Sequence, residues 1–438
     1  MEKIKKLPLI GVYVLLAYMP FHLFLSTWLS LYTGAEGLWD SGKDILTVLL
    51  LGISILIFFR EGLFRSKFFR TIFILGVIYV VIHFLFLLFD YDKLYLRAFF
   101  LGTLYNGRII AWLFIAMIAG YLLSKLPKKK LVKIILIAST ITCVIALAQF
   151  VLPKDLMEHF GYSIERGAKP SFFIDDKPDF PRVMSTVRDP NSYGAYLIIP
   201  ICILIVMLLK KSWEIKKTIL LLALHLLALL LTFSRSSWIG MFIALSVLLA
   251  SVYSKQIKQF IKIKYKYIFI AIFSLCLFTF IVKDTYVFQN VILHSDQSTV
   301  VADPNELRIQ QQNLAITEIL RKPLGHGPGT AGLVSIGNPK STFLTENYFL
   351  QIGFEVGVLG LINFIAILTV IYVYAFKEKD KFIKAIILGT FWAYVLIGIL
   401  NHVWSNESVA AQWWLLTGLV IGFYNTKPNI NKKKQIKN

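Results

Sequence analysis

Long apolar runs alternate with short polar segments along almost the whole chain. About 20 consecutive apolar residues in a helix cross the roughly 30 Å hydrocarbon core of a bilayer. Twelve runs of 16–25 residues suit this length, and they start near Leu9, Ile45, Thr71, Ala98, Leu131, Ser192, Thr218, Ser237, Tyr267, Tyr348, Ile383 and Val409. The pattern predicts an all-α polytopic membrane protein with about twelve transmembrane helices. The first run lacks a small-residue cleavage site behind it, so we expect a retained span.

The polar segments divide the chain into five parts. Residues 1–152 hold the first five predicted helices, and residues 153–190 form a medium loop. Helices six to nine follow in residues 191–283, before a large loop over residues 284–346. Residues 347–438 hold the last three helices and a lysine-rich tail.

Basic residues are concentrated in every second loop. Seven short segments hold 30 of the 46 Lys and Arg but only five of the 25 Asp and Glu. They are residues 2–6, 60–70, 125–133, 210–217, 255–266, 377–384 and 427–437. Cytoplasmic loops of membrane proteins carry such an excess of positive charge. We therefore expect both termini in the cytoplasm, and the loops 153–190 and 284–346 on the outer face.

Composition agrees with this topology. The chain is 57% hydrophobic, and its net charge of +21 lies mainly in the segments assigned to the cytoplasm. Charge distributed in this way points to membrane lipids as partners and not to nucleic acid. Cys143, Cys202 and Cys276 each stand inside an apolar run, so they carry no information about the redox compartment.

The large loop contains a predicted helix followed by a glycine turn. Asp303, Pro304 and Glu306 have the residue types of a helix start, so a helix is expected from about 304 to 320. The segment "GHGPGTAG", residues 325–332, has four glycines and a proline. Such a turn lets the backbone approach a ligand closely. Its His326 is either structural or catalytic.

Polar residues also lie within the predicted spans. Asn347, Gln351 and Glu355 are spaced four residues apart and form one polar stripe on the outer half of a helix. Arg108 stands near the middle of its span. Charged groups at the bilayer centre cost about 2.5–3.5 kcal/mol on insertion scales, so they are functional candidates by default. The structural alternative is that Arg108 pairs with an acid such as Glu355.

Three arginines are expected at the outer boundary. Arg235 stands between two spans in "LTFSRSSWIG", Arg188 begins "RDPNSYGAYL", and Arg308 lies on the predicted loop helix. Taken singly, each has a simple explanation. Arg235 could contact lipid headgroups, Arg188 could stand beside a helix cap, and Arg308 could be a solvated charge. Together they converge on one membrane face beside carboxylates. Because guanidinium binds phosphate bidentately and stays charged, the expected ligand is the pyrophosphate of a polyprenyl-linked sugar.

Four stretches resemble the O-antigen ligase and O-antigen polymerase superfamily of bacterial membrane glycosyltransferases. In order they are "RDPNSYGAYL", "LTFSRSSWIG", "LRIQQQNLAITEILRKPLGHGPGT" and "TENYFLQIGFEVGVLG", and together they cover residues 188–360. Each motif alone is weak, but their order and the predicted topology are specific. The resemblance implies a metal-independent, inverting, GT-C-like enzyme without a cofactor, on the outer face of the cytoplasmic membrane.

This resemblance implies a substrate and a set of roles. An undecaprenyl-pyrophosphate-linked glycan is the donor, and a glycan or lipid is the acceptor. Arg235, Arg188 and Arg308 are expected to bind the pyrophosphate, and Glu346 or His326 to act as the base. Ligases usually have histidine where this chain has Glu346, and an acid there is more familiar in polymerases. Polymerisation of a surface polysaccharide (of the capsule, teichuronic acid or O-antigen type) is therefore favoured, in assembly with a flippase and a chain-length regulator.

Two other functions fit a chain with twelve spans. A transporter or flippase of lipid-linked oligosaccharide would have two similar halves and a site at the midplane. This sequence shows no similarity between its halves, and its polar residues cluster at the outer edge. A non-catalytic scaffold for cell-wall assembly is supported by the span count alone.

Overall fold

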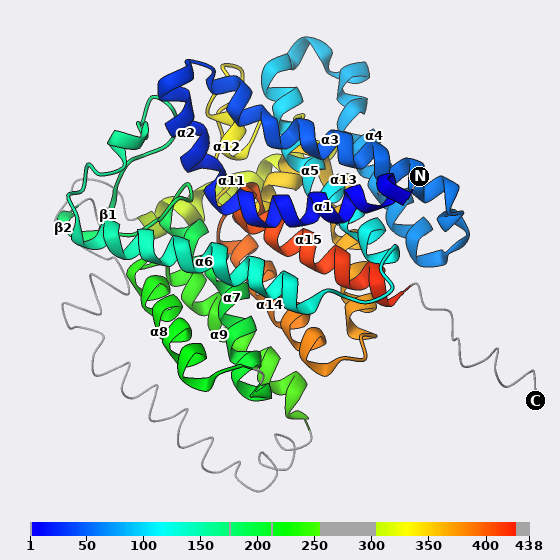
Figure 1. Cartoon of the computed structure of the whole chain (residues 1–438). Helices are drawn as coiled ribbons and strands as arrows, with labels where there is room; N and C mark the ends of the chain where they lie inside the picture. Colours follow the sequence, from blue (N-terminus) through cyan, green and yellow to red (C-terminus); the bar gives the residue numbers. More distant parts are fainter. Residues whose placement is uncertain (1, 175–176, 212, 255–303, 426–438) are drawn as a thin grey trace, which may run out of the picture.

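The structure is a computed structural model that describes residues 2–174, 177–211, 213–254 and 304–425, and helices dominate it (Figure 1). Its longer helices are α1 (Glu2–Tyr18), α2 (His22–Thr33), α3 (Glu36–Arg60), α4 (Lys67–Phe89), α5 (Leu96–Tyr121), α6 (Lys128–Val151), α7 (Pro190–Lys210), α8 (Ile215–Leu231), α9 (Arg235–Val252), α11 (Pro304–Arg321), α13 (Tyr348–Phe376), α14 (Lys381–Leu400) and α15 (Glu407–Tyr424). The shorter elements are η1 (Met19–Phe21), η2 (Leu63–Arg65), η3 (Tyr91–Lys93), η4 (Glu158–Phe160), β1 (Phe172–Ile174), β2 (Lys177–Arg182), α12 (Gly332–Ser335) and η6 (Val403–Ser405).

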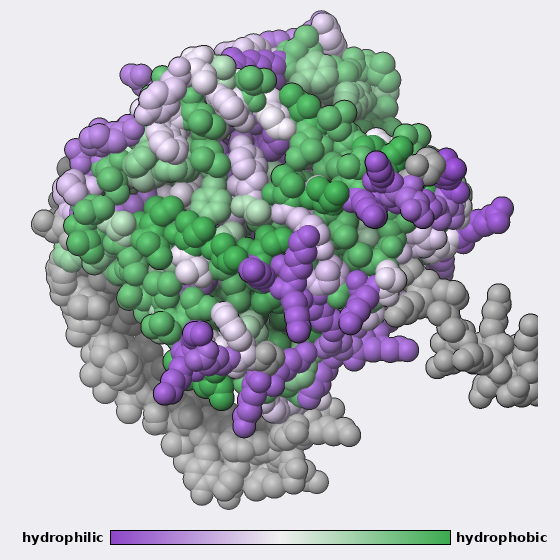
Figure 2. Space-filling view, viewed as in Figure 1, coloured by the Kyte–Doolittle hydropathy of each residue, from purple (hydrophilic) through white to green (hydrophobic). Residues whose placement is uncertain are grey.

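Nine helical segments among the described residues are long and apolar enough to cross a membrane. They coincide with nine of the predicted runs, and α8 and α15 form helices of 17 and 18 residues at two more. The run predicted near Tyr267 lies outside the described residues. Exposed apolar side chains such as Leu56 and Val144 suit contact with lipid, and Figure 2 shows a broad apolar area on this face. The predicted all-α polytopic fold is confirmed.

The first span is interrupted at Pro20, where η1 separates α1 from α2. Proline removes a helical hydrogen bond, and unpaired backbone groups are costly within a membrane. The carbonyl oxygens of Met19 and Pro20 accept hydrogen bonds from Ser408 Oγ at 2.9 Å and Thr186 Oγ1 at 2.6 Å. These two hydroxyls satisfy the break and hold α1 and α2 against the start of α15 and the segment before α7.

The centre of the bundle is formed by α5 and α15, which are buried along most of their lengths. Gly418 and Gly422 on α15 lie directly against the backbone of α5. A Cβ atom at Gly418 would lie only 2.6 Å from the carbonyl oxygen of Leu113, and one at Gly422 would overlap Met117. Small residues permit such close approach of membrane helices, where dispersion contacts between backbones stabilise association.

Ion pairs join segments that the charge pattern assigns to the cytoplasm. Lys5 Nζ lies 2.7 Å from the carboxylate of Glu61, which connects the N-terminus to the loop after α3. Asp380, just before α14, lies 2.7 Å from Lys128 Nζ and 3.9 Å from Lys210 Nζ. Among the described residues, five of the seven basic segments are therefore joined by ion pairs in two groups.

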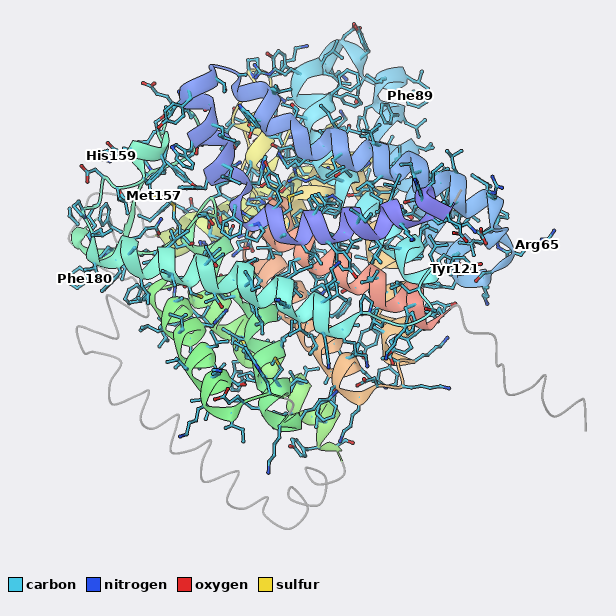
Figure 3. The ribbon with its side chains drawn as sticks, in the orientation of Figure 1. Arg65, Phe89, Tyr121, Met157, His159 and Phe180 are labelled. Carbon is cyan, nitrogen blue, oxygen red and sulfur yellow. The ribbon has the colours of Figure 1, made fainter. Side chains whose placement is uncertain are left out.

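The medium loop, expected on the outer face, lies away from the first basic segments. In Figure 3, Arg65 and Tyr121 lie at one end of the bundle, and His159 and Phe180 of the medium loop lie at the other. Figure 1 shows the start of α1 and the end of α15 on the same side as Arg65. The two described ends of the chain therefore share a side of the bundle, while their location in the cytoplasm stays a prediction.

Both predicted outer loops contain regular structure. Within residues 153–190, β1 and β2 form an antiparallel pair with Phe172 opposite Arg182. In the large loop, α11 confirms the helix expected from about 304 to 320, whereas its proposed cap Asp303 lies outside the described residues. The short helix α12 follows the glycine turn. The described parts of both loops are thus folded.

Candidate functional site

Arg235 is the first residue of α9, and hydrogen bonds on either side fix its position. Ser237 Oγ donates to the carbonyl oxygen of Asn191 at 3.0 Å, at the start of α7. Ser236 Oγ accepts from Asn401 Nδ2 at 3.1 Å, just after α14. The beginning of α9 is therefore held beside two other helix ends on the outer side.

Arg188 lies at the same junction, just before α7. The cap of α7 is Asp189, whose carboxylate accepts hydrogen bonds from the backbone N–H of Ser192 at 2.9 Å and from its hydroxyl at 2.7 Å. Arg188 itself donates to the carbonyl oxygen of Gly167 at 3.2 Å, and the charge of Glu407 acts on it. Capping thus uses Asp189, and the half-buried Arg188 lies in the field of Glu407.

A further arginine, Arg182, supports this junction and was missed by the sequence reasoning. Its Nε donates to the carbonyl oxygen of Thr232 at 3.0 Å, and its Nη2 donates to Asn191 Oδ1 at 2.9 Å. Arg182 therefore ties β2 to the end of α8 and the start of α7. It stands outside the four stretches, and no signal in the sequence indicated this contact.

Arg308 and Glu346 form an ion pair between α11 and the entrance of α13. Arg308 Nη2 lies 3.6 Å from Glu346 Oε2, and the two side chains are 34% and 35% exposed. One turn along α11, Gln312 Nε2 donates to the carbonyl oxygen of Glu346 at 3.2 Å. Glu346 has φ +49°, a left-handed conformation that non-glycine residues rarely adopt. Glu346 therefore combines contacts to α11, a left-handed backbone and a carboxylate that is partly exposed to solvent.

Asn347 starts α13 immediately after Glu346. Its Oδ1 accepts hydrogen bonds from the backbone N–H groups of Phe349 at 2.9 Å and Leu350 at 3.0 Å. This is the usual way an asparagine side chain caps a helix. Asn347 thereby fixes the position of the adjacent Glu346, and its own side chain is occupied.

Glu355, predicted on the same stripe, binds the glycine turn. Its Oε1 accepts the backbone N–H of Gly329 at 2.9 Å and of Ala331 at 3.3 Å, and its Oε2 accepts Asn106 Nδ2 at 2.7 Å. The side chain is buried. The turn at 325–332 does approach a carboxylate closely, and that carboxylate belongs to the protein itself.

The same turn fills a kink in α13. Val356 and Gly357 have non-helical backbone angles, and Gly357 has φ +72°. The carbonyl oxygen of Phe354 accepts the backbone N–H of His326 at 2.8 Å, and that of Glu355 accepts Gly327 at 2.8 Å. Since a kink deprives carbonyls of their helical partners, the turn supplies the missing donors inside the membrane.

His326 lies away from the Arg308–Glu346 pair. Its ring stacks on Phe354 with centroids 4.2 Å apart, and its Nε2 lies 3.8 Å from Glu318 Oε2. Burial and the charge of Lys322 lower the pKa of His326. Glu318 and Arg308 are ten residues apart on α11, which is about 15 Å along a helix. One reacting atom therefore cannot lie beside both His326 and Glu346.

The suggested pairing of Arg108 with Glu355 is wrong. The Arg108 side chain is buried, with Nη1 3.4 Å from Glu407 Oε1 and Nη2 donating to the carbonyl oxygen of Ser405 at 3.1 Å. Its guanidinium also stacks over the ring of Tyr105 at 4.1 Å. The partner is thus the first residue of α15, where a carboxylate resembles an ordinary helix-start acid in sequence.

Lys43 and Asp44 on α3 complete this buried cluster. Lys43 Nζ lies 3.7 Å from Glu407 Oε1 and 3.6 Å from Asp44 Oδ2, and Asp44 Oδ1 lies 4.0 Å from Arg108 Nη1. Opposite charges therefore compensate one another between α3, α5 and α15. This arrangement favours a structural role for Arg108.

His402, between α14 and α15, is a second group that the sequence reasoning missed. Its Nδ1 lies 2.8 Å from Gln351 Oε1. Burial lowers the pKa of His402 to about 4, and the charges of Asp189 and Arg308 act on it in opposite directions. His402 thus connects the Arg308 side of the site with the Arg188 side.

Residues next to the predicted arginines lie around positions 401 and 402. Ser236, which follows Arg235, bonds Asn401. Asp189, which follows Arg188, and Arg308 both act on His402 by their charges. Arg308 also pairs with Glu346. Guanidinium groups gathered here would suit a ligand that carries several negative charges.

Residues 219–365 match the family model described as O-antigen ligase. No curated protein matches the chain. The matched segment runs from α8 into α13 and includes Arg235, Arg308 and Glu346. The expected relationship to the O-antigen ligase and polymerase superfamily is therefore confirmed.

Proposed function

Because the chain is, at the family level, a membrane enzyme of the O-antigen ligase and polymerase type that acts on a lipid-linked glycan, we propose that it polymerises such glycans. The donor is an oligosaccharide on undecaprenyl pyrophosphate, and the product is a surface polysaccharide. The acidic residue Glu346, at a position where ligases usually have histidine, favours polymerisation over ligation. The enzyme is an inverting, metal-independent, GT-C-like glycosyltransferase in the bacterial cytoplasmic membrane.

The observation that carries this proposal is the arrangement around positions 401 and 402: Ser236, beside Arg235, bonds Asn401, while Arg308 and Asp189, beside Arg188, act on His402. Planar guanidinium groups can each make two parallel hydrogen bonds to phosphate oxygens. The pyrophosphate of a membrane-embedded donor lies at headgroup level, which is the level of these helix ends. The arginines hold the donor and stabilise the negative charge that develops on its pyrophosphate.

Glu346 is the proposed base. An acceptor hydroxyl oxygen attacks the anomeric carbon of the donor sugar, and its proton passes to the Glu346 carboxylate. The bond between the anomeric carbon and the pyrophosphate oxygen breaks, and its electron pair leaves with the pyrophosphate. Attack opposite the leaving group inverts the anomeric configuration. The ion pair with Arg308 holds this carboxylate at the entrance of α13.

The proposed orientation places this chemistry on the outer face. The basic segments at the other end of the bundle lie in the cytoplasm, so both termini are cytoplasmic. A flippase delivers the donor to the outer leaflet, and a chain-length regulator is a further expected partner. The basic tail over 427–437 binds anionic lipid.

Reconstitution tests the proposal directly. The purified full-length protein in nanodiscs is mixed with the lipid-linked repeat extracted from the producing strain, without divalent metal and with a chelator. We expect a ladder of glycans still carrying the lipid, together with free undecaprenyl pyrophosphate. If the folded protein leaves the lipid-linked repeat unchanged, the proposal is refuted. Transfer of one glycan to a lipid acceptor, without a ladder, identifies a ligase.

A further inference from the structure

The carboxylate of Glu355 is surrounded by hydrogen-bond donors. Two backbone N–H groups bond Oε1, and Asn106 Nδ2 bonds Oε2. The side chain of Gln351 lies next to the same carboxylate. Its Oε1 faces His402 on the other side.

The Gln351 amide determines which nitrogen of His402 carries hydrogen. Gln351 Oε1 lies 2.8 Å from His402 Nδ1, and an amide oxygen can only accept. Nδ1 therefore carries the hydrogen and donates it. In the neutral ring, Nε2 is left as an acceptor with a free lone pair. The contact with Gln351 thus sets the tautomer of His402.

His402 Nε2 is buried and has no hydrogen-bond partner among the described residues. A buried acceptor without a partner costs about 1–3 kcal/mol. Three histidines of the bundle differ: His22 Nε2 faces Asp40, His83 Nε2 contacts Asn106, and His225 Nε2 contacts Ser139. His326 Nε2 is also buried without a hydrogen-bond partner, but Glu318 lies 3.8 Å from it. His402 therefore keeps an unpaired acceptor at the candidate site.

The surroundings define what this position can bind. Arg308 and Asp189 are the charged groups that act on His402, from α11 and from the cap of α7. A lone pair repels phosphate oxygens, and the positive Arg308 disfavours a metal cation there. A neutral hydroxyl is the remaining donor, and sugar acceptors carry many of them.

We infer that His402 Nε2 accepts a hydrogen bond from a hydroxyl of the acceptor sugar and thereby positions this sugar beside Glu346. The inference rests on the proposed function and adds a binding group for the acceptor. His402 lies outside the matched segment 219–365, which contains Glu346 and Arg235. Its role is positioning and selection of the acceptor.

Two isosteric variants separate the two nitrogens. In His402→Asn, the amide nitrogen replaces Nδ1 and can still bond Gln351, but nothing replaces Nε2. In His402→Gln, the longer amide reaches the position of Nε2 and can accept the hydroxyl. The exposed His159 in the medium loop provides the matched control, His159→Asn.

The full-length protein in nanodiscs receives a limiting amount of the lipid-linked repeat and increasing amounts of the same repeat released from its lipid as acceptor. Release of undecaprenyl pyrophosphate is measured, and binding of the donor alone is measured separately. We expect His402→Asn to raise the half-saturating acceptor concentration by about tenfold, as the loss of one hydrogen bond predicts. Donor affinity should stay within about twofold, and His402→Gln should recover most of the loss.

Each other outcome is decisive. If His402→Asn matches the active wild type in acceptor saturation, the inference is wrong while the proposed function stands. If both variants lose donor binding, His402 belongs to the donor site and the inference is also wrong. If the wild type releases no undecaprenyl pyrophosphate in this assay, the proposed function fails and the inference falls with it.

Discussion

The guanidinium of Arg108 lies 3.4 Å from the carboxylate of Glu407, although 299 residues separate the two in sequence. Both side chains are buried where α5 crosses α15. A buried pair contributes little net stability, because desolvation offsets attraction, but removing one partner leaves an uncompensated charge. The pair therefore makes correct assembly of the first and last thirds of the chain a condition of folding.

Arg108→Met should destabilise the protein by about 3–5 kcal/mol, because it leaves Glu407 without its main counter-charge. The measurement is the midpoint of thermal unfolding in detergent, together with accumulation in membranes. The double variant Arg108→Met with Glu407→Gln should recover part of the loss. Arg321→Met, which removes an exposed arginine, is the matched control. A wild-type midpoint for Arg108→Met alone would show that Lys43 suffices to compensate Glu407.

Arg235→Lys should leave the protein folded but lower turnover by about tenfold or more, because lysine keeps the charge and loses the planar fork. A hydrogen bond to a charged group is worth about 1.5–3 kcal/mol, which sets this scale. Initial rates with the lipid-linked repeat give the result. Arg97→Lys, at an exposed position near the same side, should behave as wild type. Normal turnover of Arg235→Lys would return Arg235 to simple contact with lipid headgroups.

Glu346→Gln should bind the donor normally and lower the rate by about 10²–10⁴-fold, the usual effect of removing a positioned base. The same change at Glu355 should instead lower the yield of folded protein, since Glu355 bonds the glycine turn. Donor binding and single-turnover rates separate these effects. An active Glu346→Gln beside a His326→Ala that binds donor without turnover would assign the base to His326.

Sequence reasoning predicted most of the fold, because the length of each apolar run and the position of its charges are local properties. It also named Arg308 and Glu346 as candidates, because they lie in recognisable stretches, and the structure pairs their side chains. It failed where the answer depends on which helices cross. Glu407 resembles an ordinary acid at a helix start, and only the packing of α15 against α5 places it beside Arg108. His402 was missed for the same reason, since its contact with Gln351 joins residues 51 positions apart in the sequence.

Protonation of His402 should make the free energy of unfolding depend on pH. Its pKa is lowered to about 4 in the folded protein, from about 6.5 for an unfolded chain. Between these values the unfolded state binds more protons, so stability is complete above pH 6.5 and falls as the pH decreases towards 4. Unfolding midpoints between pH 7.5 and pH 4.5 test this. His402→Gln should make the unfolding midpoint change less steeply with pH. A smaller dependence on pH should remain, because the pKa of His326 is also lowered.

Cysteine labelling should locate the large loop on the outer face. Ile336 is 62% exposed and stands directly after α12, so Ile336→Cys should react with a membrane-impermeant maleimide on intact cells. Its neighbour Ser335 is fully buried and would not report on sidedness. Cys143 and Cys202 are buried and should give no background. Reaction only after the cells are opened would place the loop inside and remove the proposed mechanism.

The kink of α13 has a consequence for how relatives of this enzyme can be recombined. Val358 N–H donates to the carbonyl oxygen of Pro323 at 2.9 Å, next to the bonds that the turn makes with Phe354 and Glu355. Loop and span therefore share one hydrogen-bond register. A chimera that exchanges the loop alone would break this register within the membrane, whereas exchange of residues 304–365 as one block would preserve it. The loop and the span that it contacts must therefore be exchanged together.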